Sequence, residues 1–373
     1  MRNVLFFAIL QLRQLLRKDF RPMIKHRKSP SSSRDFGADC VRILSICLLF
    51  WLHFYLRNGF YYQEVTDFYG FLAVSMRPVF MCCVPLFVIL TGYLKCGKNW
   101  DLHYYRSIVP ILLSWIVISL IHLVYKIYVL HQTADFRTWL LDFLAFKLAN
   151  YSWYIGMYMG LFLIIPLLNM IWNSCSSRNM HLAVVATLLA VSVLPSTINT
   201  LYKESSLVPN YFSSLYYVAY YMIGCYIRTY RPKINLIFSI ALVLGLGMFL
   251  AAINIHTREE AAKFYSGYSA SYNHLITVLM STLLFLTAYQ FSCQKMLLQK
   301  TAAAISNVVL EMYLLSYLFD SRIYVMHAGE YTFSGYFKYG LAMTAAVFIC
   351  SFLSALIVHH GIRILLKLTG FYR

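Results

Sequence analysis

The sequence predicts an all-α fold, a polytopic membrane bundle of about ten transmembrane helices with both termini in the cytoplasm. Of the 373 residues, 60% are hydrophobic and only 12% are charged, whereas a soluble domain carries about 25% charged residues. The apolar residues form runs near the roughly 20 residues that a helix needs to cross a bilayer. Most of the 32 Lys and Arg residues lie in alternate connecting segments, as in cytoplasmic loops.

The expected spans follow one another along most of the chain, so no soluble domain fits between them. The basic stretch KHRKSPSSSR precedes the first span and marks the cytoplasmic side, while the outer loops hold most of the acidic residues. Ten spans return the C-terminus to the cytoplasm. The expected spans are 39–58, 71–94, 108–129, 152–173, 180–197, 213–229, 235–254, 272–292, 301–321 and 339–360.

The chain divides into two parts. Residues 1–38 are expected to form a basic cytoplasmic N-terminal segment, and residues 39–373 the membrane domain. Within the first part, NVLFFAILQL is too short to span and lacks a small-residue cleavage site, which favours an interfacial helix over a signal peptide. Because this basic segment directly precedes a span, the net charge of +18 indicates contact with membrane lipid and not with nucleic acid.

Cysteine usage argues against a metal site. The nine cysteines lie mostly inside apolar runs, and no C-x-x-C pair occurs. Zinc-ligand spacing and the disulfide framework of a secreted protein are therefore both absent. We interpret the cysteines as small residues of the membrane core, and we expect no metal.

The first span, VRILSICLLFWLHF, carries two ionisable residues, Arg42 and His53. With about 100° and 1.5 Å per residue, eleven residues bring both side chains to one helix face, about 16 Å apart along the axis. Ionisable groups inside a membrane are costly and are functional candidates. The alternatives are an Arg42 that extends to the headgroups and a His53 that is a neutral, hydrogen-bonded core residue.

Three further stretches bear on function. PLFVILTGYLKCGKN ends a span at Thr91 and Gly92, where a missing side chain permits close approach of another helix. HYYRSIVPILLSW places Arg106 at the start of the third span, just ahead of a proline. YSWYIGMYMGLFLIIPLLN opens the fourth span with aromatic residues, including Trp153, and closes it at a proline.

Taken in order, R-x10-H, the run into [ST]-G-[FY]-L, the inner-loop arginine and the W-[YF] opening resemble acyltransferase family 3. This family acylates surface polysaccharides, peptidoglycan and related glycans, and the resemblance covers about residues 36–362. It implies that His53 is the catalytic histidine and that Arg42 and Arg106 bind or use acyl-CoA. The residues expected to support these three are Thr91, Gly92, Trp153 and Glu311.

The chain departs from the family pattern at three positions. His103 stands where the family often has the first arginine of R-x-x-R, and Thr91 stands where serine is usual. Ser316, in EMYLLSY, replaces a late histidine, so the role of that histidine is not carried over.

Glu311 lies inside the ninth expected span. The step of nine residues to Asp320 is about 900°, so the two carboxyl groups point in opposite directions. Glu311 should therefore have a partner of its own, either for function or, in the alternative interpretation, as a packing hydrogen bond to a neighbouring helix.

These residues suit one reaction. Arginine binds the phosphates of a thioester donor through its planar fork, and an imidazole can remove the proton from an acceptor hydroxyl. We expect an O-acetyltransferase that moves an acyl group, in the first place acetyl, from cytoplasmic acyl-CoA to a cell-surface or lipid-linked glycan. Acyl-CoA is then a substrate, no tightly bound cofactor is expected, and the expected location is a bacterial plasma membrane.

Two other functions fit part of the pattern. A transporter or flippase of lipid-linked sugars would also place Arg and His in the membrane, but no internal repeat of the transporter type is visible. A non-catalytic scaffold or lipid-binding protein would use the basic N-terminus but would leave Arg42, His53 and Arg106 without a role.

Overall fold

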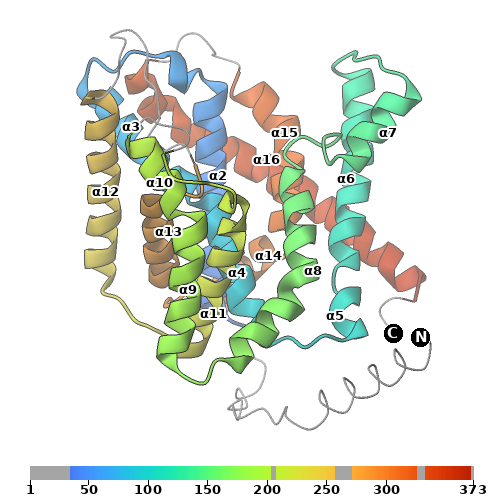
Figure 1. Cartoon of the computed structure of the whole chain (residues 1–373). Coiled ribbons are helices and arrows are strands. Elements are labelled where there is room, and N and C mark those ends of the chain that lie inside the picture. Colours follow the sequence, from blue (N-terminus) through green and yellow to red (C-terminus); the bar gives the residue numbers. More distant parts are fainter. Residues whose placement is uncertain (1–33, 203–206, 257–270, 326–331, 371–373) are drawn as a thin grey trace, which may run out of the picture. The chain divides into compact units, whose positions relative to one another are not determined.

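The computed structural model describes residues 34–202, 207–256, 271–325 and 332–370 (Figure 1). Contacts divide the chain into two units, Met1–Arg34 and Asp35–Arg373. Nearly all of the predicted basic segment, including its interfacial helix, lies outside the described residues. Within the described ranges every regular element is a helix, which confirms the all-α prediction.

The described helices follow one another along the chain. They are α2 (Phe36–Arg57), α3 (Phe68–Met81), α4 (Cys83–Lys95), α5 (Leu102–Arg106), α6 (Val109–Tyr128), α7 (Phe136–Leu144), α8 (Trp153–Ser174), α9 (Arg178–Ser192), α10 (Leu194–Leu201), α11 (Tyr216–Tyr230), α12 (Leu236–His256), α13 (Leu275–Ala288), α14 (Met296–Asn307), α15 (Val309–Ile323) and α16 (Phe333–Leu368). Two short 3₁₀ turns, Phe60–Tyr62 and Ser213–Leu215, complete the series.

Seven of the described helices or joined helix pairs are long and apolar enough to cross a membrane, and the bent pair α14–α15 would be an eighth. The protein is therefore a multi-pass membrane protein by length and composition. Each of the ten expected spans coincides with helix, but α11 and α13 have only 15 and 14 residues. At 1.5 Å per residue they are shorter than the roughly 30 Å hydrocarbon layer. The count of ten remains a prediction.

Helix α2 holds the position from which the site is built. It packs against α3, α4, α13, α14, α15 and α16, and Figure 1 shows it among these helices. Thirteen of its 22 residues are buried, so its polar side chains must find partners on the neighbouring helices. Two such partners lie on α14 and α15, which meet at a bend of 65°.

Helices α4 and α11 cross at their glycines. A Cβ on Gly92 would lie 2.0 Å from the carbonyl oxygen of Tyr221, and one on Gly224 would lie 2.0 Å from that of Ile89. No side chain can occupy these positions without moving a backbone. The close helix approach predicted at Gly92 is thus confirmed, and this glycine acts through packing.

Replacing Gly92 by alanine should destabilise the protein. The added methyl group must push two backbones apart, and such overpacking costs about 1–3 kcal/mol. Thermal unfolding of the detergent-purified protein would measure the loss. Gly160→Ala on α8 is the matched control, because nothing lies within 4 Å of its Cβ position. Equal melting temperatures for the two variants would contradict the packing role.

Candidate functional site

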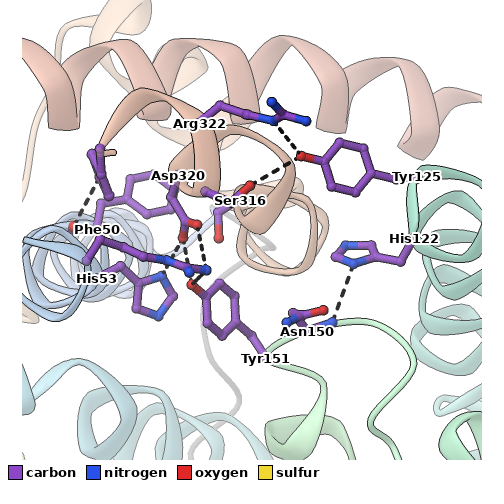
Figure 2. A network of polar contacts seen from close by, with 12 residues as sticks. Phe50, His53, His122, Tyr125, Asn150, Tyr151, Ser316, Asp320 and Arg322 are labelled. Atoms are coloured by element: carbon purple, nitrogen blue, oxygen red, sulfur yellow. Dashed lines mark hydrogen bonds and ion pairs between the residues drawn. The ribbon is translucent and has the colours of Figure 1, made fainter. Parts of the chain in front are cut away.

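Asp320, on α15, is the centre of a buried polar network (Figure 2). Its carboxylate is 0% exposed. One oxygen, Oδ2, lies 3.1 Å from Nδ1 of His53 and accepts a hydrogen bond of 2.9 Å from the Tyr151 hydroxyl. The other, Oδ1, accepts one of 3.3 Å from the Arg57 guanidinium. All three contacts suit an ionised carboxylate, which can only accept hydrogen bonds.

The contact with Asp320 indicates which ring nitrogen of His53 carries the proton when the imidazole is neutral. Because an ionised carboxylate can only accept, we assign the proton of the neutral imidazole to Nδ1. Nε2 then carries the lone pair, and no described residue is hydrogen-bonded to it. An aspartate on Nδ1 both orients the ring and stabilises the imidazolium that forms when Nε2 takes a proton. Nε2 of His53 is therefore the ring nitrogen left to take up a proton.

Tyr151, a member of this network, has an unusual backbone conformation. It lies in the loop before α8 with φ of +70°, a left-handed value that aromatic residues rarely adopt and that stores strain. Its ring lies 4.0 Å from that of His53, and its hydroxyl also accepts a hydrogen bond of 3.1 Å from Arg57. Burial and the nearby Asp320 charge raise the pKa of Tyr151, so its hydroxyl stays protonated and donates.

Neighbouring side chains keep this loop in place. The hydroxyl of Tyr313 donates to the carbonyl of Tyr151. The backbone N–H of Asn150 donates to Nδ1 of His122 over 3.4 Å, and Nε2 of His122 lies 3.0 Å from the Leu314 carbonyl oxygen. Both tethers tie the loop to α15, the helix that carries Asp320. The strain at Tyr151 is therefore held by the packing around it.

Arg42, at the other end of α2, is also tied to the α14–α15 pair. Its guanidinium donates to Asp39 over 3.1 Å and to the hydroxyl of Ser306 over 3.0 Å. Ser306 in turn donates to Asp39 over 2.6 Å. Since Arg42 contacts α14 and His53 contacts α15, both side chains point toward the same helix pair, as the eleven-residue spacing predicts.

A cavity of about 370 Å³ extends along α2 from Arg42 to Leu49. Leu49 precedes His53 by four residues, about one helical turn. Lys95 joins Arg42 in the lining, while Tyr154 and Tyr313 belong to the group of aromatic residues around Tyr151. The cavity is of the size of small-molecule sites and is largely apolar, with Arg42 and Lys95 as its basic residues. His53 does not line the cavity itself, but Leu49, one turn earlier on α2, does.

The other predicted residues take different positions. Glu311 lines the cavity and has partners of its own, Ser114 and His359. Thr91 also lines it, with its hydroxyl bonded to the Phe87 carbonyl of its own helix. Three residues do not line this cavity: Arg106 at the exposed end of α5, Trp153, which stacks on Tyr272, and Gly92 at the α4–α11 crossing.

Two of the three positions that depart from the family pattern, Ser316 and His103, take no part in the network. The Ser316 hydroxyl is buried and bonds to the carbonyl of Tyr313 on its own helix. His103 is exposed on α5. In the described part of the chain, no group of three or more His, Cys, Asp or Glu side chains could hold a metal ion.

Sequence reasoning missed Asp320, Tyr151 and Arg57. A usable signal existed for Asp320, because a histidine at mid-membrane needs a partner and this acid lies in an apolar run. Arg57 falls at the end of the first expected span, 39–58, where a basic residue is common and gives no signal of a buried partner. No sequence pattern indicates the left-handed backbone of Tyr151.

The comparison with protein families decides the class of this protein. A family model described as an acyltransferase domain matches residues 35–360. The chain belongs to acyltransferase family 3. Neither the curated proteins nor the solved structures contain a significant match. With its apolar helices, the family 3 protein described here is a membrane acyltransferase.

The ion pair at Asp320 should show as coupled effects on stability. Arg57→Gln removes a donor from the buried carboxylate, which should lower the free energy of unfolding by about 1–3 kcal/mol. In an Asp320→Asn background the same change should cost less, because no buried charge is left unpaired. Unfolding of the four detergent-purified proteins measures the coupling, with the exposed Arg137→Gln as control. Strictly additive losses would contradict the pair.

Proposed function

We propose that this protein is an O-acetyltransferase of a bacterial plasma membrane. It transfers an acyl group, in the first place acetyl, from cytoplasmic acyl-CoA to a hydroxyl group of a cell-surface or lipid-linked glycan. The observation that carries the proposal is the Asp320–His53 pair at 3.1 Å inside a chain of an acyltransferase family. That pair leaves an imidazole nitrogen available as a base on α2, one helical turn beyond Leu49, which lines the cavity.

The chemistry balances with these residues alone. Nε2 of His53 takes the proton of the acceptor hydroxyl as its oxygen attacks the thioester carbonyl carbon. The carbon–sulfur bond then breaks, and the imidazolium returns its proton to the departing thiolate. Asp320 stabilises the imidazolium between these two transfers. The products are an acyl ester and free CoA.

The donor occupies the cavity with its nucleotide end at the basic mouth. Arg42 and Lys95 line this end, and Lys95 also contacts Ser107, the residue after Arg106. Cations at this end suit the phosphates of CoA. The apolar walls accommodate the arm that leads to the thioester, and the acceptor approaches His53 from the Arg57 side. No tightly bound cofactor is needed.

The roles of His53 and Arg42 separate in a binding and turnover experiment. His53→Ala should keep its affinity for acetyl-CoA but lose acetyl transfer by about 10²- to 10⁴-fold, the usual contribution of a general base. Arg42→Ala should weaken acetyl-CoA binding by about 10- to 150-fold, through loss of a charge-assisted contact. Arg42→Lys should recover part of this loss.

Calorimetry with acetyl-CoA and mass spectrometry of acetylated surface glycan are the two measurements. Arg137→Ala, exposed on α7, is the control for removing one arginine. A His53→Ala protein that loses donor binding while Arg42→Ala keeps it would refute both assignments. A wild-type protein that moves lipid-linked sugar across the membrane without cleaving acetyl-CoA would favour a flippase instead.

The same proposal includes ten spans with both termini in the cytoplasm, supported by the distribution of Lys and Arg. A single cysteine introduced at Lys263 in a cysteine-free background should react with an impermeant reagent in intact cells. One introduced at Arg373 should react only after permeabilisation. The reverse pattern would refute this topology.

A further inference from the structure

The wall of the cavity contains a second acid–histidine pair. Glu311 on α15 accepts a hydrogen bond of 3.0 Å from the hydroxyl of Ser114 on α6, and its carboxylate lies 3.0 Å from Nδ1 of His359 on α16. All three residues line the cavity, and we call them the Glu311 cluster. The reaction at His53 does not use this cluster, so its presence in an apolar wall needs its own explanation.

Burying the carboxylate of Glu311 costs free energy unless hydrogen bonds compensate for the lost water. Glu311 is 4% exposed, so its carboxylate oxygens need hydrogen-bond partners. Both contacts with Ser114 and His359 use Oε1, and no other described residue is hydrogen-bonded to the carboxylate. Oε2 is therefore an acceptor available to a ligand in the cavity.

Along the chain, Glu311 lies between the two residues that contact the polar ends of α2. Arg42 contacts Ser306, and His53 contacts Asp320. Glu311 lies between these two partners along the α14–α15 pair, about 13 Å before Asp320 along the axis of α15. Glu311 lines the same cavity as Arg42 and Leu49, so a ligand that fills this cavity lies against the Glu311 cluster.

The chemistry of such a ligand follows from the order of these groups. Its end at Arg42 and Lys95 is anionic, its middle donates a hydrogen bond to a carboxylate, and its far end reacts at His53. In acyl-CoA, the arm between the phosphates and the sulfur carries two amide groups, whose N–H bonds are such donors. A fatty acyl chain has no donor and would leave Oε2 unpaired.

We propose that the Glu311 cluster is a subsite for an amide of the donor's pantetheine arm, with Oε2 of Glu311 accepting from its N–H. This inference rests on the proposed function. The cluster positions the arm so that the thioester reaches His53, and it takes no part in proton transfer. A role limited to tying α6, α15 and α16 together would affect stability but not the recognition of donors.

Two donors separate this subsite from the phosphate contacts. Acetyl-CoA carries phosphates and arm, whereas S-acetylpantetheine carries the arm alone. Glu311→Gln should raise KM about tenfold for both donors, as expected for a lost charge-assisted hydrogen bond, with a much smaller effect on kcat. Arg42→Ala should raise KM for acetyl-CoA and leave that for S-acetylpantetheine unchanged. Glu64→Gln, an exposed residue before α3, is the matched control.

The outcomes are distinct. A folded Glu311→Gln protein with wild-type KM for both donors would overturn the subsite while leaving the proposed function intact. A wild-type protein that uses neither donor would overturn the proposed function itself. If Glu311→Gln does not fold, Ser114→Ala and His359→Asn take its place. Each should raise KM for both donors about threefold, since each removes one contact that orients the carboxylate, and unchanged values would overturn the subsite.

Discussion

A buried negative charge at Asp320 is the constraint on which the arrangement of the site depends. Leaving a carboxylate unpaired in a low-dielectric bundle would cost several kcal/mol, so its three donors are fixed in position. Two of them, His53 and Arg57, are four residues apart on α2 and therefore share a face. The third, Tyr151, contacts the carboxylate from a loop where its own backbone is left-handed. The chemistry proposed at His53 thus depends on charge pairing that also stabilises the fold.

Helix α2 is held to its neighbours by polar contacts at two places, which we call its two anchors. The position of the cavity follows from them. Arg42 and Asp39 hold α2 to Ser306 on α14, while His53 and Arg57 hold it to α15. Between the anchors, α14 and α15 bend by 65°, so the pair cannot follow the straight axis of α2 throughout. The side chains at this bend line the cavity together with Leu49. A break in a membrane-spanning helix is tolerated where the interrupted backbone lines a cavity.

Helical periodicity predicts which residues of one helix share a face, but it does not predict contacts between helices. Within one helix, 100° per residue placed Arg42 with His53 and separated Glu311 from Asp320, and the structure agrees with both. The missing side chain at Gly92 indicated the close crossing. The partners of Asp320 come from other elements, and periodicity contains no information about distances between helices. Hydropathy does not show where a helix begins and ends, which is why the expected spans 213–229 and 272–292 are longer than α11 and α13.

The positions of the two substrates in the proposed reaction follow from the polarity of α2. The cavity extends along α2 as far as Leu49, one turn before His53, and Arg57 lies one turn beyond His53. A thioester held in the cavity and a hydroxyl arriving from the Arg57 side would meet at the same nitrogen from opposite directions. Neither substrate needs to cross the bundle. Only the acyl group changes sides, and His53 returns its proton to the departing thiol, so each turnover leaves the buried charges at Asp320 and Arg57 unchanged. A transporter would instead require a path for the whole sugar past this fixed ion pair, at the cost of breaking it.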